Sequence, residues 1–86
     1  MSSTPQTEFK TYPLADELEH IGARLISSCP RASDGDLVVL AVWKQHENGG
    51  CEYATWRWFP ATGLNWGDYY LGKDAAYANY GRRIRE

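Results

Sequence analysis

The sequence predicts an α+β fold in which a three-stranded antiparallel sheet is flanked by an N-terminal and a C-terminal helix, both on one sheet face. Two apolar stripes at helical spacing, one near each end of the chain, predict the helices. β-rich runs separated by turn signals predict the sheet between them. The chain has 86 residues, the size of one domain. We expect residues 1–10 to be a flexible segment and residues 11–86 to form a single α-β-β-β-α domain.

An apolar stripe predicts the first helix, because its members recur at spacings of four, three and four: Leu14, Leu18, Ile21 and Leu25. Pro13 suits the first turn of a helix, where its missing N–H is harmless. Thr11, just upstream, is a plausible N-cap. We expect this helix to end by Ser28, because Pro30 disfavours helical backbone in the residue before it.

The three predicted strands are Leu37 to Gln45, Cys51 to Phe59, and Leu64 to Leu71. Asn48-Gly49 between the first two favours a two-residue type I′ turn, which needs positive φ at both positions. This turn places Ala41 opposite Trp56. Pro60 to Gly63 is the second turn, and its pairing places Tyr53 beside Tyr70.

The final helix is predicted from Ala75 to about Arg85, with Asp74 as its cap. Its apolar stripe consists of Tyr77, Tyr80 and Ile84. Three arginines near its C-terminal end complement the negative end of the helix dipole.

Strand alternation divides the large side chains between two sheet faces. One face carries no charge and is assigned to the core: Val39, Ala41, Trp43, Ala54, Trp56, Trp58, Tyr69 and Leu71. The second face mixes charges with large apolar groups: Leu40, Val42, Lys44, Tyr53, Arg57, Phe59, Trp66, Asp68 and Tyr70. Large apolar patches on a surface mark contact sites. A one-residue slip of the hairpin would exchange the two faces.

Composition narrows the classes of function. The net charge is −2 and the pI is about 5.6, so no basic excess exists to neutralise a phosphate backbone. The longest apolar run, Leu37 to Trp43, is far shorter than the roughly 20 residues of a membrane span. The first ten residues lack the features of a signal peptide. We therefore expect a cytoplasmic protein in which Cys29 and Cys51 are free thiols.

Catalytic and metal motifs are weak in this sequence. His20 lies beside the first apolar stripe, but no local motif places a nucleophile next to it. His46 and Cys51 meet at the predicted hairpin end without the spacing of a metal site. Asp34-Gly35-Asp36 is interpreted as a polar turn. We expect no enzyme, no cofactor and no metal, and a pocket using His20 or His46 is kept as an alternative.

The C-terminal part resembles small uncharacterised bacterial proteins with a TW…WGxY…A…R pattern. The residues that carry it are Tyr53, Thr55, Trp56, Trp66, Gly67, Tyr69, Tyr70, Ala75, Ala76, Arg82 and Arg83. The resemblance covers about the last 35 residues and implies a bacterial or mobile-element origin, with no activity attached. In size and charge the chain also resembles phage or plasmid inhibitors of host systems. The helix–β3–helix order is similar to that of the double-stranded-RNA-binding domain, but the lysine-rich start of that family's last helix is missing.

These observations favour a non-enzymatic module that binds a protein partner, or its own copy as a homodimer, through the second sheet face. The predicted binding residues are Leu40, Val42, Tyr53, Arg57, Trp66 and Tyr70, because aromatic residues and arginine dominate interface energies. One alternative is that the same aromatics stack on unpaired bases. Another is that the N-terminal segment around Phe9 and Tyr12 covers this face.

Overall fold

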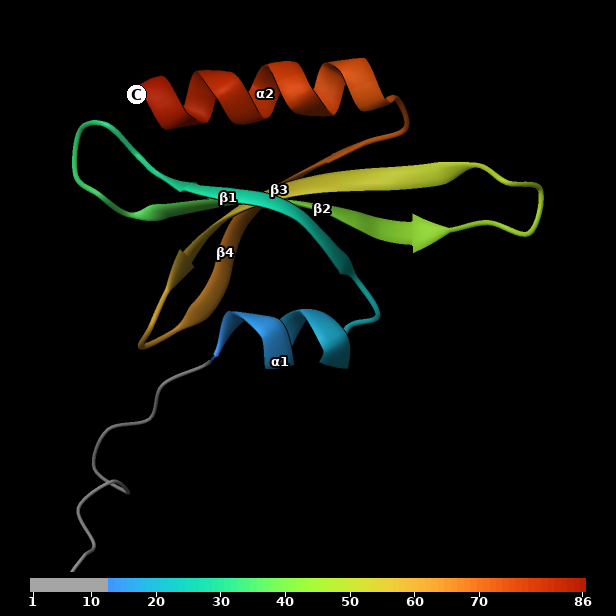
Figure 1. Ribbon diagram of the computed structural model, residues 1–86, viewed down its shortest axis with the longest axis horizontal. Coiled ribbons are helices and arrows are strands. Elements are labelled where there is room, and N and C mark those ends of the chain that lie inside the picture. Colours follow the sequence, from blue (N-terminus) through green and yellow to red (C-terminus); the bar gives the residue numbers. More distant parts are fainter. Residues whose placement is uncertain (1–12) are drawn as a thin grey trace, which may run out of the picture.

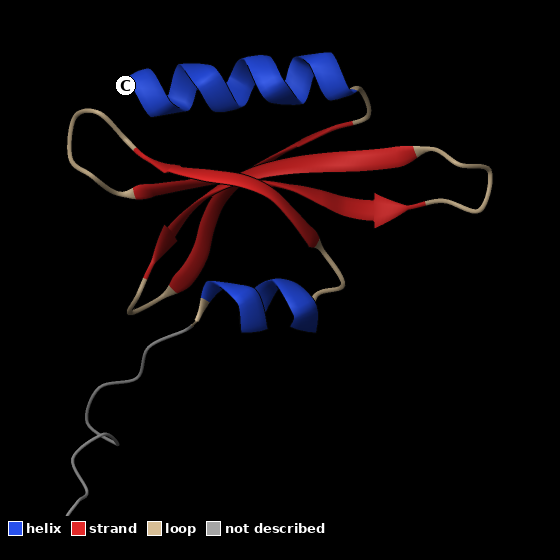
Figure 2. Cartoon of the chain, in the orientation of Figure 1, coloured by secondary structure: helices blue, strands red, loops and turns tan. Residues whose placement is uncertain are grey.

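The computed structural model describes residues 13–86 and confirms the α+β class, with one strand more than predicted. The order is α1 (Leu14–His20), β1 (Arg24–Pro30), β2 (Leu37–Gln45), β3 (Cys51–Phe59), β4 (Gly63–Tyr70) and α2 (Lys73–Arg85). The four strands form an antiparallel sheet in the order β1-β2-β3-β4. The two helices lie on opposite faces of this sheet (Figure 1; Figure 2). The expected flexible segment and the Thr11 cap lie outside the described residues.

The first helix is half as long as predicted, because its C-terminal end is set by Gly22. Gly22 adopts φ +76°, its N–H donates to the Glu19 carbonyl at 3.0 Å, and the Ala23 N–H donates to the Leu18 carbonyl at 2.9 Å. This pair of bonds is a Schellman motif, which ends a helix. The rest of the predicted helix, from Arg24 onwards, forms the edge strand β1. Leu25 therefore belongs to a strand and not to a helical stripe.

The β2–β3 hairpin confirms the predicted faces although its register differs. Gly49 has φ +90° and its N–H donates to the His46 carbonyl at 3.0 Å, so the loop is a type I turn followed by a left-handed glycine. Ala41 pairs with Ala54 and not with Trp56, a shift of two residues, and a bulge follows at Trp43. Because side chains alternate with period two, an even shift leaves the same residues on each face.

The face beneath α1 holds the predicted apolar core. Leu18 of α1 packs on a buried cluster from β2 and β3, which consists of Val39, Ala41, Ala54 and Trp56. Trp43 and Trp58 pack around it. The prediction that Tyr69 and Leu71 belong to this core is wrong. Both are exposed, and Leu71 is 80% accessible. The short α1 lies mainly against the two edge strands and leaves the outer part of the face uncovered.

The opposite face is a second buried layer beneath α2, which corrects the prediction that both helices share one face. Val38 and Leu40 are fully buried there. The hydroxyl of buried Thr55 donates to the side-chain carbonyl of buried Asn79 at 2.6 Å, which joins β3 to α2. This face carries too many large apolar groups to remain in water, and covering it with a helix removes them from solvent.

α2 begins slightly earlier than predicted and is rotated relative to the predicted stripe. Its N-cap is Gly72 with no side-chain cap, so the Asp74 cap is wrong. Ala76 and Asn79 are its buried residues, whereas Tyr77 is exposed. The small Ala76 lets the helix approach the sheet, and Tyr80 reaches Ser27 of β1 through a hydroxyl–hydroxyl bond of 2.8 Å. Among residues 13–86, no helix is long and apolar enough to cross a bilayer.

Candidate functional site

Trp66 of β4 is the most unusual aromatic residue of the fold. It is 62% exposed and has φ +53°, the one positive φ outside glycine in residues 13–86. It occupies a bulge, because the β3–β4 pairing shifts between Thr55 and Arg57. A left-handed conformation is a true outlier for a bulky residue, and such strained positions concentrate at functional sites. The fold therefore holds a large exposed ring in a costly backbone conformation.

Arg83 of α2 fixes the bulge in place. Its guanidinium donates to the Trp66 carbonyl, and it pairs with the Asp68 carboxylate at 3.3 Å. The same guanidinium lies 3.4 Å from the Thr55 hydroxyl. One side chain thus joins the helix to both sides of the bulge. Trp66 is exposed, but its backbone is anchored by charge-assisted bonds.

The Trp66 ring rests on two neighbours of β3. Phe59 meets it edge to face, with ring centroids 5.6 Å apart and an interplanar angle of 90°. The Arg57 guanidinium lies 4.8 Å from the centre of the Trp66 ring and 5.4 Å from that of Phe59. Both contacts are favourable, through the ring quadrupole. We call Arg57, Phe59 and Trp66 the Trp66 cluster.

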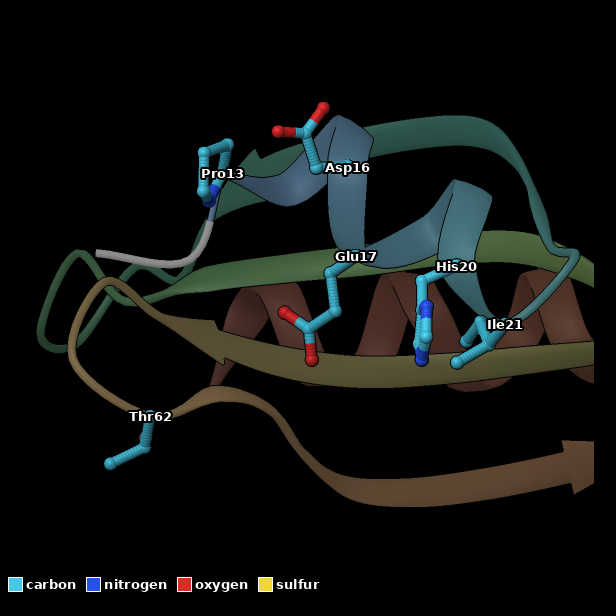
Figure 3. Close-up of a pocket in the computed structure, with 6 residues that line it drawn as sticks. All are labelled: Pro13, Asp16, Glu17, His20, Ile21 and Thr62. Carbon is cyan, nitrogen blue, oxygen red and sulfur yellow. The ribbon is translucent and has the colours of Figure 1, made fainter. Parts of the chain in front are cut away.

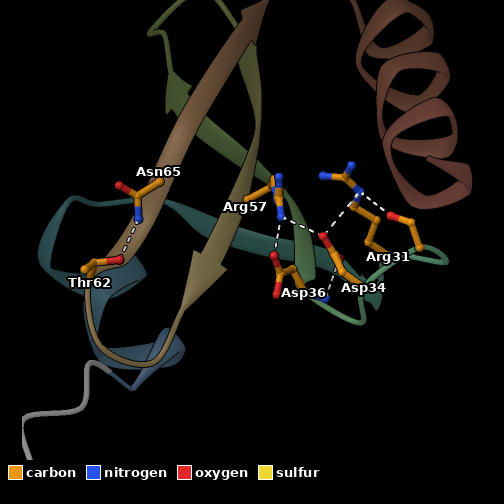
Figure 4. Close-up of polar contacts among 7 residues, drawn as sticks. Arg31, Asp34, Asp36, Arg57, Thr62 and Asn65 are labelled. Atoms are coloured by element: carbon orange, nitrogen blue, oxygen red, sulfur yellow. Dashed lines mark hydrogen bonds and ion pairs between the residues drawn. The ribbon is translucent and has the colours of Figure 1, made fainter.

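Two aspartates of the turn between β1 and β2 neutralise the charge of Arg57. The guanidinium pairs with Asp36 and, at 3.1 Å, with Asp34, which also lies 3.9 Å from Arg31 (Figure 4). The Ala32 N–H donates to the Ile84 carbonyl at 2.7 Å, so the turn is tied to the end of α2. Two arginines and two aspartates form this network. The Trp66 cluster is consequently rigid and close to electrically neutral.

Acidification is expected to weaken this network. The pKa of Asp34 lies below its usual 3.8, first because the Asp36 N–H donates to the carboxylate at 3.0 Å, and also because Arg31 and Arg57 attract the charge. A carboxyl whose pKa is lower in the folded than in the unfolded state adds stability when the pH is above its unfolded-state pKa. That stability is lost as the pH falls through the folded-state pKa. We expect wild type to lose stability below about pH 3.8 and the Asp34→Asn variant to lose less.

Chemical denaturation at a series of pH values checks this expectation, together with an NMR titration of the Asp34 carboxyl carbon. Equal acid sensitivity in both proteins would contradict the role given to Asp34.

The structure brings together some of the predicted binding residues and separates others. Arg57 and Trp66 are in contact, and Tyr53 pairs with Tyr70 across β3 and β4, as predicted. Tyr53, Thr55 and Arg57 alternate along one face of β3, and α2 covers the middle residue through Asn79. The helix therefore divides the predicted set into a tyrosine pair and the Trp66 cluster.

The sequence predicts that Leu40 and Val42 lie on this face and are exposed. The predicted exposure is wrong. Their accessibilities are 0% and 8%, because α2 packs over β2. They belong to the interior, where large aliphatic residues are normally found.

Sequence reasoning missed the partners of Arg57 but placed a second aromatic group on one face of the sheet. Asp34 and Asp36 were interpreted only as turn residues, yet they hold Arg57 from more than twenty positions away. On the α1 side, the rings of Trp43, Trp56 and Tyr69 lie with centroids 5.4 to 6.2 Å apart. Strand alternation predicts that these three side chains share one face, and the structure confirms it.

Of the two histidines considered for a pocket, His20 lines a hollow of about 560 Å³ between α1 and the β3–β4 turn, and His46 does not. Glu17 and His20 project from the same side of α1, and Asp16 points away from them (Figure 3). The Leu64 N–H donates to the Glu17 carboxylate at 2.9 Å, so this carboxylate is a link between α1 and β4. The described side chains of this hollow provide neither an activated nucleophile nor an oriented pair of a general base and a general acid.

The histidine and cysteines considered as possible metal ligands do not converge. His46 pairs with Glu52 at 2.8 Å at the tip of the β2–β3 hairpin. Cys51 pairs with Gln45 and Cys29 with Val38, and both thiols are free. Within residues 13–86, no group of three or more His, Cys, Asp or Glu side chains could hold a metal ion.

No family model matches the chain, and no curated protein and no solved structure is significantly similar to it.

Proposed function

We propose that this chain is a non-enzymatic binding module that holds a partner protein through the Trp66 cluster. The observation that carries the proposal is the left-handed, bulged and exposed Trp66, anchored by Arg83 and backed by Arg57 and Phe59. Tryptophan and arginine are among the residue types most enriched at the hot spots of protein interfaces. Because the ring is already fixed, little side-chain entropy is lost when a partner binds.

Local charge favours an uncharged apolar segment as the partner surface. Arg57 is balanced by Asp34 and Asp36, and Arg83 by Asp68. These arginines have little positive charge left for phosphates, and the chain as a whole carries −2. Nucleic acid, the alternative ligand of the same aromatics, is therefore less well supported than protein. Inhibition of a host system would be one biological use of such a module.

Substitution of Trp66 by asparagine separates binding from stability. Asparagine tolerates the left-handed backbone better than other residues except glycine, so the ring is removed without added strain. Affinity for the partner should fall about 30-fold or more, which corresponds to a hot spot of about 2 kcal/mol. The free energy of unfolding should change by less than about 1 kcal/mol, because relief of backbone strain offsets the lost ring contacts.

The experiment uses affinity capture from the native cell with wild type, Trp66→Asn and a Leu71→Ala control, followed by titration of the purified partner. Leu71 is more exposed than Trp66 but lies outside the cluster. Equal capture by wild type and Trp66→Asn would contradict the proposal. Salt-dependent binding of a short single-stranded oligonucleotide, lost in Trp66→Asn, would favour the nucleic-acid alternative.

A further inference from the structure

The two helices are fixed to the sheet by very different sets of bonds. α2 is held along its length, because Asn79, Tyr80 and Arg83 each hydrogen-bond to a residue of the sheet. α1 lies on the other face (Figure 1), and within residues 13–86 its single hydrogen bond to the sheet joins the Leu64 N–H to the Glu17 carboxylate at 2.9 Å. No ion pair joins α1 to the rest of the described chain. The seat of α1 therefore depends mainly on apolar contact.

The apolar contact of α1 is small, and hollows lie along both of its sides. Leu18 is the one buried residue of this helix. A hollow of about 560 Å³ separates α1 from Thr62 in the β3–β4 turn, and a second of about 510 Å³ lies between Leu14 and Leu25 of β1. A helix of seven residues is far below the roughly 12 residues at which isolated helices become marginally stable in water. Its structure therefore depends on a seat that neighbouring side chains fill only in part.

The one polar anchor of α1 is itself incompletely satisfied. Glu17 Oε1 is buried and has no hydrogen-bond partner among the described residues, although the other oxygen of the same carboxylate accepts the Leu64 N–H. A buried polar atom without a partner costs free energy, and this cost is recovered when water reaches it. The carboxylate also lies directly against Gly63, where a Cβ atom would be 2.6 Å from Glu17 Oε2. The anchor is therefore specific in geometry but weak in net free energy.

The connection between α1 and β1 has the properties of a hinge. It is only three residues long, from Ile21 to Ala23, and its central residue is Gly22 with φ +76°. No atom lies within 4 Å of the position that a Cβ would occupy at Gly22, so this part of the chain turns in open space. Glycine adopts positive and negative φ with similar ease, and hinges consist of a few such residues at the ends of elements.

We propose that α1 is a lid, hinged at Gly22, which opens as a unit while the sheet and α2 stay folded. Opening breaks the bond between Glu17 and Leu64 and lifts Leu18 from the cluster that contains Val39 and Trp56. The buried part of this face then joins its uncovered outer part in one apolar surface. The lid thus controls access to the face beneath α1. The Trp66 cluster is held from the α2 side, so opening leaves it intact.

Native-state hydrogen exchange of the full chain, followed by NMR at increasing urea concentrations below the unfolding transition, tests the lid. The Ile21 and Ala23 amides, which donate to the Glu17 and Leu18 carbonyls, should exchange together with the Leu64 amide. Their protection should be at least about a hundredfold lower than that of the central strand β2, and less dependent on urea, because opening exposes less surface than unfolding. Equal protection and equal urea dependence in α1 and β2 would overturn the proposal, as would α1 amides protected less than about tenfold.

Substitutions separate opening of the lid from unfolding of the whole chain. Val38→Ala removes two buried methyl groups on the α2 side, so protection of β2 should fall about tenfold while that of α1 stays unchanged. Glu17→Ala removes the bond to Leu64 and should lower the protection of α1 about tenfold. Glu19→Ala, at an exposed position of the same helix, is the matched control and should change it less than about twofold. An equal loss of protection in α1 and β2 on Val38→Ala would show that α1 opens only by global unfolding and would overturn the proposal.

Discussion

Replacing Leu40 by alanine is expected to lower the free energy of unfolding by about 2–5 kcal/mol. Leu40 is the largest of the fully buried side chains, enclosed between β2 and α2. Its truncation removes buried apolar contacts and leaves a cavity that rigid neighbours fill only in part. Urea denaturation monitored by circular dichroism measures the change.

The same substitution discriminates between the two roles considered for Leu40. If it lay on an exposed contact face, truncation would change binding and leave stability within about 0.5 kcal/mol of wild type. Leu71→Ala is the matched control, because this leucine is 80% exposed and should show that small effect. Similar unfolding energies for both variants would show that α2 does not cover β2 in solution.

Replacing Gly67 by alanine is expected to destabilise the fold by about 1–3 kcal/mol through overpacking. A Cβ atom at this position would lie 2.7 Å from both Trp56 Nε1 and the Tyr69 hydroxyl, far inside van der Waals contact. Trp56 is at the centre of the core beneath α1 and its indole N–H donates to the Tyr69 hydroxyl at 3.3 Å. The buried Trp56 ring cannot move away without disturbing the core.

Gly81→Ala provides a control of opposite sign. This glycine lies inside α2, where alanine favours the helix by up to about 1 kcal/mol, and the nearest neighbour of an added Cβ is the flexible end of Arg85 at 3.3 Å. Combining Gly67→Ala with Trp56→Ala should cost less than the sum of the two single substitutions, since the indole edge (Nε1 and Cδ1) that blocks the added methyl group is then absent. Independent, additive effects of the two substitutions would argue against the close approach of Trp56 to Gly67.

The local signals of the sequence located most elements but misjudged the first helix. Leu25 continues the helical spacing of Leu14, Leu18 and Ile21, so periodicity alone extended the helix into β1. Gly22 was the contrary signal, because glycine one residue past the C-cap supports the Schellman motif seen here. In this segment the conformational role of a glycine overrides a continued four-residue apolar spacing.

The candidate site was only partly accessible to sequence reasoning. The pairing of Tyr53 with Tyr70 and the proximity of Arg57 to Trp66 follow from strand alternation and were predicted. The bulge at Trp66 depends on a local slip in the ladder and on Arg83, which reaches it from another element. Contacts between elements distant in sequence leave no periodic signature, so neither the anchor nor the Asp34 and Asp36 pairs with Arg57 could be anticipated.

Sequence by itself determined the α+β class, the positions of β2, β3 and β4, and the division of side chains between two sheet faces. That division withstood a wrong hairpin register, because a shift of two residues preserves the alternation. Only the tertiary structure decided which helix covers which face. Both faces were apolar enough to form a core, and the choice depended on Ala76 and Asn79 packing against β2 and β3, which local preference does not encode.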